Sequence, residues 1–132
     1  MMKKKTIWIV DDDPIYQKIA SKIVNKSEMF SEIVTFVNGK EAISAVHDVF
    51  ENKSTKPDII LLDINMPVMD GWEFMDELSL LNSKKVQDFT IYIVSSSIAV
   101  EDKSKSKKYQ AILGYISKPL TVNDLVLISS DE

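Results

Sequence analysis

Short apolar runs separated by polar segments recur along the chain and predict β-strands. We expect five strands, at Thr6–Val10, Glu32–Val37, Ile59–Asp63, Phe89–Val94 and Leu113–Ser117. The third run is the clearest, because four consecutive apolar residues bounded by turn residues are typical of a strand buried on both faces of a parallel sheet. This run ends abruptly in a single carboxylate, Asp63, and a proline-containing loop follows.

Amphipathic stretches with the period of an α-helix lie between the apolar runs. Asp13 is a suitable N-cap for the first helix, and Pro14 is a suitable first helical residue. The apolar stripe that should face the core comprises Ile15, Ile19, Ala20, Ile23 and Val24. The inward stripes of the other helices are Ala42, Ile43, Ala45, Val46, Val49 and Phe50, then Phe74, Met75, Leu78 and Leu81 in a helix from about Trp72, and finally Leu125 and Ile128 in a helix that Thr121 can cap.

Two segments do not follow the apolar pattern. Asn82–Asp88 is polar and is expected to be a loop. Glu101–Gln110 contains four lysines and no clear apolar stripe. We therefore expect weak packing and greater mobility in the second segment, even if it is helical.

Strand and helix alternate five times, which is typical of an α/β fold with helices on both faces of a parallel sheet. We therefore predict a doubly wound five-stranded sheet in a flavodoxin-like three-layer sandwich. The strand order 2-1-3-4-5 is adopted from folds of this type, since the pattern alone does not establish it. The length of 132 residues suits one core, so residues 1–132 are expected to form a single domain.

Composition narrows the classes of partner and compartment. The net charge is −4 and all 16 basic residues are Lys. Bidentate Arg is the usual reader of bases and phosphates, so direct nucleic-acid binding is not expected. The absence of Cys excludes disulfides and thiolate metal sites. No apolar run could span a membrane, and the stretch after Lys3–Lys5 is too short for a secretory signal, so we expect a cytoplasmic protein without membrane contact.

Polar side chains follow the predicted strands at the carboxyl edge of the sheet, where open α/β folds place their ligand sites. In the adopted order, strands one, three, four and five are neighbours, and they end at Asp11 and Asp12, Asp63, Ser95 and Lys118. Neighbouring strands lie about 4.8 Å apart, so the aspartates should crowd together and raise one another's pKa. A divalent cation would relieve this repulsion. Few hard oxygen ligands, with room for water and phosphate, suit Mg²⁺ better than Ca²⁺.

Lys118 is predicted to lie roughly 10 Å from Asp63, two strand spacings away. The flexible Lys118 side chain can cover part of that gap, and a phosphoryl group on Asp63 would fill the remainder. Ser95, which lies between, could donate a hydrogen bond to a phosphoryl oxygen. A nucleophile, a metal site, a hydroxyl and an ammonium group are the parts that phosphoryl transfer requires. Each residue alone is also consistent with a helix cap or a turn. Their occurrence at the ends of neighbouring strands favours a site with Asp63 as its reacting group.

Four motifs resemble, in order and spacing, the receiver domain of bacterial two-component response regulators, namely Val10–Pro14, Leu62–Gly71, Val94–Ser96 and Tyr115–Pro119. The resemblance covers nearly the whole chain. It implies that Asp63 accepts a phosphoryl group from a histidine kinase or a His-containing phosphotransfer protein. It also implies that Asp12 and Asp63 bind Mg²⁺ directly. Asp11 would help through water, and the main-chain carbonyl of Asn65 would be a further ligand.

The resemblance also implies roles for the other polar residues. Lys118 would contact the phosphoryl group, and Ser95 would be the switch hydroxyl whose movement draws the Tyr115 ring inward. Asn65 and Ser97 occupy positions where the family tunes dephosphorylation. Such a domain is not an enzyme for a separate substrate, but a phosphoacceptor that catalyses its own phosphorylation and dephosphorylation. The bond between Lys118 and the proline that follows it is expected to be cis.

The output face of the family would be made here by Glu101–Gln110, Leu113–Ser117 and Thr121–Ile128. Its lysines could meet an acidic partner, although a solvated surface is the preferred interpretation. The downstream protein target is therefore unknown, and a monomer or a phosphorylation-dependent dimer is expected.

The leading hypothesis is a stand-alone receiver in a phosphorelay, because no output region follows within these 132 residues. In a longer gene product, the same domain would regulate an attached output module. A pure interaction module that has lost the chemistry is disfavoured by the intact site residues. A metal-dependent phosphatase of the Asp-x-Asp kind would need an acid where Asn65 stands. The three glycines form no dinucleotide-binding fingerprint.

Overall fold

The computed structural model describes residues 5–66, 68–81, 89–96 and 100–130 of the chain. Its strands are β1 (Thr6–Val10), β2 (Glu32–Phe36), β3 (Ile59–Asp63), β4 (Ile91–Ser95) and β5 (Ile112–Ser117). Its helices are α1 (Pro14–Ser27), α2 (Gly39–Phe50), α3 (Gly71–Ser79), α5 (Val100–Ser106) and α6 (Val122–Ser130). The predicted alternation of strands and helices is confirmed. The predicted loop Asn82–Asp88 lies outside the described residues.

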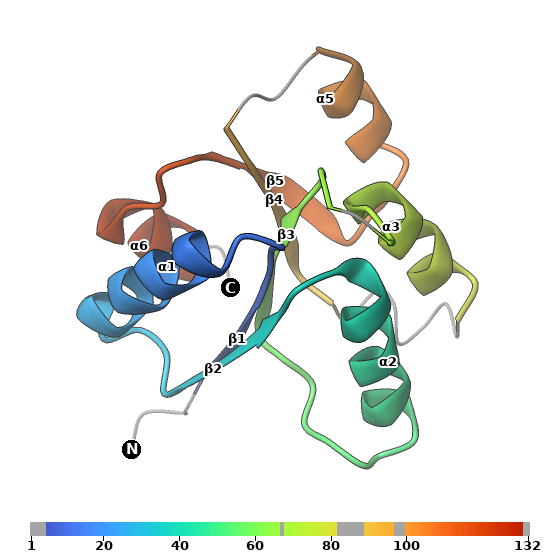
Figure 1. Cartoon of the computed structure of the whole chain (residues 1–132), viewed down its shortest axis with the longest axis horizontal. Helices are drawn as coiled ribbons and strands as arrows, with labels where there is room; N and C mark the ends of the chain where they lie inside the picture. Colours follow the sequence, from blue (N-terminus) through green and yellow to red (C-terminus); the bar gives the residue numbers. More distant parts are fainter. Residues whose placement is uncertain (1–4, 67, 82–88, 97–99, 131–132) are drawn as a thin grey trace.

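The sheet has the strand order β2-β1-β3-β4-β5, and every neighbouring pair is parallel. This confirms the predicted doubly wound fold. Helices α1 and α6 cover one face of the sheet, while α2 and α3 cover the other, which produces three layers (Figure 1). Helix α5 lies beyond the carboxyl ends of the strands, above α3 in Figure 1.

The register of the strands decides which side chains meet at the carboxyl edge. The residue before Asp11 on β1 pairs with the residue before Asp63 on β3, so these two aspartates emerge side by side. At the end of β4, Ser95 pairs with Ser117, and Lys118 therefore follows one residue beyond that pair. Because all strands run in the same direction, their polar ends gather at one edge of the sheet.

The carboxyl edge is supported by a fully buried core. Every residue of β3 and of β4 is buried. Alternate residues of β1 enter opposite clusters, with Ile7 and Ile9 against α1 and α6, and Trp8 and Val10 against α2 and α3. Apolar burial is the main stabilising contribution to a fold, at about 25 cal/mol per Å². The side chains at the strand ends therefore project from a rigid base.

Helix α1 packs part of the predicted stripe against the core, namely Ala20, Ile23 and Val24, and turns the rest of it to solvent. Ile15 and Ile19 are 70% and 50% exposed, so their predicted burial was wrong. Ala20 and Val24 are buried as expected, and Tyr16 packs partly against the same core. The stripe that packs against the core, which adds Tyr16 to Ala20, Ile23 and Val24, overlaps the predicted one and has the same helical spacing. Tertiary packing thus decided between two faces that the periodicity allowed.

Several element boundaries also differ from the predicted ones. Strand β2 ends one residue earlier, at Phe36, and β4 runs over Ile91–Ser95 rather than Phe89–Val94. The helix expected within Glu101–Gln110 covers only Val100–Ser106. Among the α5 side chains that the structure describes, Ser106 alone is buried. The expected scarcity of apolar packing in this segment is thus confirmed.

Candidate functional site

Three carboxylates meet at the carboxyl edge of the sheet. Asp11, Asp12 and Asp63 each offer an oxygen atom within 4.8 Å of the other two. Asp11 and Asp63 are buried, and Asp12 is exposed. The crowding predicted from the strand order is confirmed, and one member of the cluster is open to solvent.

Main-chain hydrogen bonds orient the two buried carboxylates. The N–H of Asp13 donates to Oδ1 of Asp11 at 2.9 Å, and the N–H of Asn65 donates to Oδ1 of Asp63 at 3.3 Å. The N–H of Asp11 itself donates to the carbonyl oxygen of Phe36 at 3.0 Å. These main-chain donors lie two residues further along the chain, so local sequence contributes to the orientation of both side chains.

Gly71 allows the start of α3 to pack directly against Asp63. A Cβ atom at this position would lie 2.6 Å from the carbonyl oxygen of Asp63, which is closer than real Cβ contacts. The N–H of Gly71 donates to the carbonyl oxygen of Ile64 at 2.9 Å. The loop after β3 is therefore closed back onto the strand that it follows, and only glycine fits there.

Lys118 reaches across the site and forms an ion pair that the sequence did not predict. Its Nζ lies 2.7 Å from Oδ2 of Asp11 and 3.9 Å from Oδ2 of Asp63. The predicted gap of roughly 10 Å is the spacing of the strands, and the flexible Lys118 side chain, which was expected to cover part of that gap, brings its ammonium group to the carboxylates. The N–H of Lys118 donates to the carbonyl oxygen of Ser95 at 3.0 Å, and the bond to Pro119 is cis as expected.

Tyr16, on α1, also borders the site, and the sequence reasoning missed it. The Nζ of Lys118 lies 4.2 Å from the centroid of the Tyr16 ring. Burial raises the pKa of the Tyr16 hydroxyl, and the negative charges of Asp11 and Asp63 raise it further. The sequence offered one signal, an aromatic residue one turn after the cap Asp13, and that signal does not show which way the ring faces.

Asp63 has an unusual electrostatic environment. Burial, followed by the charge of Asp11, raises the pKa of its carboxyl group from 3.8 to about 6, while Lys118 opposes this rise. Desolvation acts in this direction because it disfavours the charged form of a carboxyl group. At pH 7 the carboxylate is thus mainly ionised, in a place where additional positive charge would stabilise it.

The oxygen atoms of this cluster suit a hard divalent cation. Aspartate oxygens are the protein ligands that Mg²⁺ prefers, and the ion retains water molecules that need an open position. The exposed Asp12 provides that opening, and the charge of Asp11 adds to the effect of burial in raising the pKa of Asp63, so a cation would stabilise the ionised cluster. The main-chain carbonyl of Asn65 stays a predicted ligand, on an exposed residue next to the cluster.

The two residues expected to form a switch have different surroundings. Ser95 is buried at the end of β4. Tyr115, on β5, is half-buried, and its hydroxyl lies 2.6 Å from Oγ of Ser106 and 3.0 Å from the carbonyl oxygen of Lys103. Tyr115 is thus attached to α5. The switch roles stay predictions, and Ser97 lies outside the described residues.

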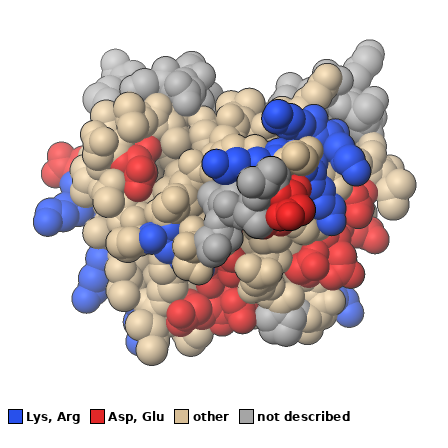
Figure 2. Space-filling view, turned by 90° about the horizontal axis from the view of Figure 1, so that it is seen from above, with Lys and Arg blue, Asp and Glu red and all other residues tan. Residues whose placement is uncertain are grey.

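Aromatic and charged side chains attach the turn after α5 to α3. The ring of Tyr109 stacks on that of Trp72 with centroids 6.0 Å apart, and its hydroxyl donates to Asp76. Burial and then this hydrogen bond raise the pKa of Tyr109 to about 12. The Nζ of Lys105 lies 5.2 Å from the centroid of the Trp72 ring. Figure 2 shows lysine side chains gathered on the side where α5 lies, with acidic side chains beside them.

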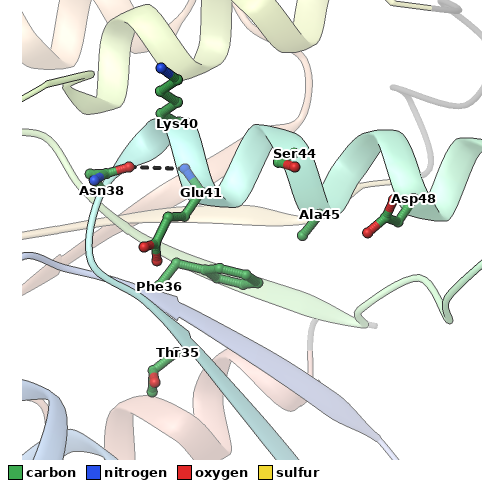
Figure 3. A pocket seen from close by; sticks show the side chains of 8 residues that line it. All are labelled: Thr35, Phe36, Asn38, Lys40, Glu41, Ser44, Ala45 and Asp48. Atoms are coloured by element: carbon green, nitrogen blue, oxygen red, sulfur yellow. Dashed lines mark hydrogen bonds between the residues drawn. The ribbon is translucent and has the colours of Figure 1, made fainter.

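A groove of about 610 Å³ lies between the edge strand β2 and α2 (Figure 3). Its lining includes Phe36, Lys40 and Asp48 and none of the predicted site residues. The hydrogen bond drawn in Figure 3 is the cap of α2, in which the N–H of Glu41 donates to Oδ1 of Asn38. Charges of both signs line the groove.

The sequence matches the model of one protein family and is similar over part of its length to a known protein. The model of the response regulator receiver domain matches residues 7–129. The chain is 39% identical over 72 residues to a protein-glutamate methylesterase/protein-glutamine glutaminase of Aliivibrio fischeri, a match that covers 54% of this chain and 18% of that protein. The matched region is thus less than a fifth of that relative's length.

Solved response regulators have a similar fold. A two-component response regulator from Cytophaga hutchinsonii has a TM-score of 0.89 and 28% identity, and the match covers 98% of this chain and 97% of the other. A receiver domain of a sensor histidine kinase from Pseudomonas aeruginosa PAO1 has a TM-score of 0.77 and 18% identity, with 98% and 97% covered. That structure has a magnesium ion coordinated in its active-site cleft. In the part of our chain that is described, no helix is both long and apolar enough to cross a membrane.

Proposed function

Because the chain belongs to the response regulator receiver domain family, we propose that it is a switch in which Asp63 accepts the phosphoryl group. Receiver domains of two-component systems are phosphoacceptor signalling domains. The position of Asp63 supports its role, since it is buried at the end of β3, within 4.8 Å of two other carboxylates and 3.9 Å from the Lys118 ammonium group. Residues 1–132 would act as one receiver domain, alone or within a longer protein.

The proposed donor is the phosphohistidine of a histidine kinase or of a phosphotransfer protein. A carboxylate oxygen of Asp63 attacks phosphorus, the P–N bond breaks as the O–P bond forms, and the imidazole leaves with a proton from solvent. A water molecule later attacks the same phosphorus, which releases inorganic phosphate and regenerates the carboxylate. With a pKa of about 6, Asp63 is mainly ionised, and therefore nucleophilic, at pH 7.

The other site residues would stabilise the phosphoryl oxygens. Asp11, Asp12 and Asp63 would hold Mg²⁺, since the family binds this ion in its acidic cluster. When bound, the ion supplies positive charge that offsets the carboxylates and the phosphoryl group. The ammonium group of Lys118 would contact one phosphoryl oxygen, and the Ser95 hydroxyl would donate to another. Such contacts stabilise the charge that develops during phosphoryl transfer.

The proposed readout passes through Ser95 and Tyr115. Movement of the Ser95 hydroxyl toward a phosphoryl oxygen would draw the Tyr115 ring inward. The Tyr115 hydroxyl would then leave Ser106 and the Lys103 carbonyl oxygen, to which it is now attached. The surface formed by α5, β5 and α6 would change, and a downstream protein would bind it, either to a monomer or to a phosphorylation-dependent dimer.

Acetyl phosphate provides the direct test. The chain is incubated with acetyl phosphate and Mg²⁺, and its intact mass is measured. We expect a single added phosphoryl group, which is absent in Asp63→Asn and suppressed by a chelator. Asp58→Asn is the matched control, because Asp58 lies at the opposite end of β3, where its Oδ2 accepts a hydrogen bond from the Thr6 N–H at 2.7 Å. An unmodified wild type, or equal modification of Asp63→Asn, would refute the proposal.

The donor class is tested separately. A histidine phosphotransfer protein carrying a labelled phosphoryl group should transfer the label to the wild-type chain and not to Asp63→Asn. If acetyl phosphate modifies Asp63 but every phosphohistidine donor fails, the acceptor role stands and the donor assignment is wrong.

A further inference from the structure

We propose that Tyr16 is a positioning residue, whose ring holds the ammonium group of Lys118 between Asp11 and the phosphoacceptor Asp63. The inference deepens the proposed function, because it rests on Lys118 as the phosphate contact. It concerns a residue on α1, which the motifs of the site do not include.

The geometry places the Lys118 ammonium group among three neighbours. Its Nζ lies 2.7 Å from Oδ2 of Asp11, 3.9 Å from Oδ2 of Asp63 and 4.2 Å from the centroid of the Tyr16 ring. The Lys118 side chain is only 21% exposed. Attraction between a cation and an aromatic face is stronger when the cation is partly removed from water. The ring therefore contributes to holding the ammonium group over the site.

An aromatic ring suits a lysine that has to move. In the structure the ammonium group is hydrogen-bonded to Asp11 but is too far from Asp63 for a hydrogen bond. To contact a phosphoryl group on Asp63, it would exchange part of its contact with Asp11 for a phosphoryl oxygen. A ring face attracts a cation without a directional hydrogen bond, so it can support the ammonium group in both positions. A further carboxylate would instead add negative charge beside three carboxylates already within 4.8 Å of one another.

The start of α1 and the core determine where the ring lies. Oδ1 of the cap residue Asp13 accepts a hydrogen bond from the N–H of Tyr16 at 3.2 Å, and the side chain packs against the α1–α6 core. The Tyr16 hydroxyl oxygen is buried and has no hydrogen-bond partner among the described residues. Packing, and not the hydroxyl, thus holds the ring in place. Tyr16→Phe should therefore preserve the ring position, whereas Tyr16→Leu keeps apolar bulk and removes the aromatic face.

Phosphorylation kinetics provide the first test. With acetyl phosphate and Mg²⁺, Tyr16→Leu should phosphorylate about 3- to 30-fold more slowly than the wild type, the range expected for loss of a partly desolvated cation–π contact. Tyr16→Phe should restore most of the rate. In a Lys118→Ala background, Tyr16→Leu should change the rate by no more than about twofold, because the group that the ring positions is gone. An equal slowing by Tyr16→Leu in both backgrounds would overturn the proposal.

A spectroscopic readout tests the contact without relying on activity. Ring currents should shift the NMR signals of the Lys118 ε-methylene protons upfield in the wild type and in Tyr16→Phe, and this shift should disappear in Tyr16→Leu. Ile23→Val, a conservative change elsewhere on α1, is the control and should leave the shift intact. An unchanged signal in Tyr16→Leu would refute the positioning role, even if Asp63 were not phosphorylated. A chain that shows the shift but resists acetyl phosphate would refute the proposed function alone.

Discussion

Two regions of the molecule are held in place by different kinds of contact. One is the acidic edge, formed by Asp11, Asp12, Asp63 and Lys118, and the other is the α5 segment, residues 100–110. The carboxylates of the acidic edge project from the ends of β1 and β3, of which β3 is entirely buried, and Lys118 follows β5. In the α5 segment, Ser106 is the one fully buried side chain that the structure describes. The segment is instead attached through Tyr109 to α3 and through its contact with Tyr115 to β5.

This difference suits the two parts of the proposed switch, the phosphoryl-accepting site and the surface that a partner would bind. Phosphoryl transfer requires a nucleophile and charged groups at fixed positions, which a buried core provides. Readout requires a segment that can rearrange at a small expense of free energy, and polar and aromatic contacts at a half-exposed surface are individually weak. The boundary between the two regions passes through Tyr115, which lies on the sheet but bonds to α5.

The largest expected effect distinguishes the two regions by stability. Leu62 is fully buried in β3, so Leu62→Ala should reduce the free energy of unfolding by about 2–5 kcal/mol. Tyr109→Ala removes a half-exposed stacking contact and a hydrogen bond to Asp76, and should reduce it by a smaller amount, about 1–3 kcal/mol. Urea denaturation measures both values. Similar losses in the two variants would show that the α5 segment is packed as firmly as the core.

A smaller effect on stability is expected at Asp63, where a substitution should stabilise the folded chain at pH 7 and not destabilise it. Its pKa rises from 3.8 to about 6 on folding, so the folded chain binds the proton more tightly than the unfolded chain. Without Mg²⁺, stability should therefore fall as pH rises from about 4 through about 6, and level off above that. This loss amounts to at most about 3 kcal/mol. Asp63→Asn should remove the pH dependence in this window and be more stable than the wild type at pH 7.

Unfolding in urea between pH 4 and pH 8, in the presence of a chelator, measures this effect. Added Mg²⁺ should then stabilise the wild type more than Asp63→Asn, because binding to the folded state adds to its stability. A steeper loss of stability in Asp63→Asn as pH rises would contradict the electrostatic account of this carboxylate.

The smallest effect concerns the boundary residue Tyr115. Tyr115→Phe removes the hydroxyl from Ser106 and the Lys103 carbonyl oxygen, but these two groups remain bonded to each other at 2.8 Å. The loss of global stability should therefore be about 0.5–1.5 kcal/mol. Amide hydrogen exchange should become faster in α5 and stay unchanged in β3. Faster exchange across the whole sheet would show that α5 and the core unfold as one unit.

Much of the candidate site could be predicted from the sequence, because its residues lie at the ends of apolar strands. Asp11 and Asp63 follow buried runs, and local main-chain donors orient both carboxylates. Ser95 and Lys118 were placed at the same edge by a strand order taken from related folds, and the register bears that order out. Their chemical roles stay predictions, since geometry brings groups together without showing a reaction.

Other features depended on contacts between distant parts of the chain. The ion pair of Lys118 joins residues 107 positions apart, and its length depends on how a flexible side chain responds to carboxylate charge. The exposure of Ile15 and Ile19, and with it the direction of Tyr16, depended on which of two overlapping stripes packed against the sheet.

The sequence by itself determined the order of strands and helices along the chain, the carboxylates at the strand ends and the cap that begins α1. Each of these follows from residues that are close together in the chain, where periodicity and local hydrogen bonds act. Only the tertiary structure decided that Lys118 reaches Asp11 and that the Tyr16 ring faces the Lys118 ammonium group. It also decided that Tyr109 attaches the α5 segment to α3 and that Tyr115 attaches it to β5. Those contacts join separate elements, so they depend on side-chain direction and charge that exist only once the sheet has assembled.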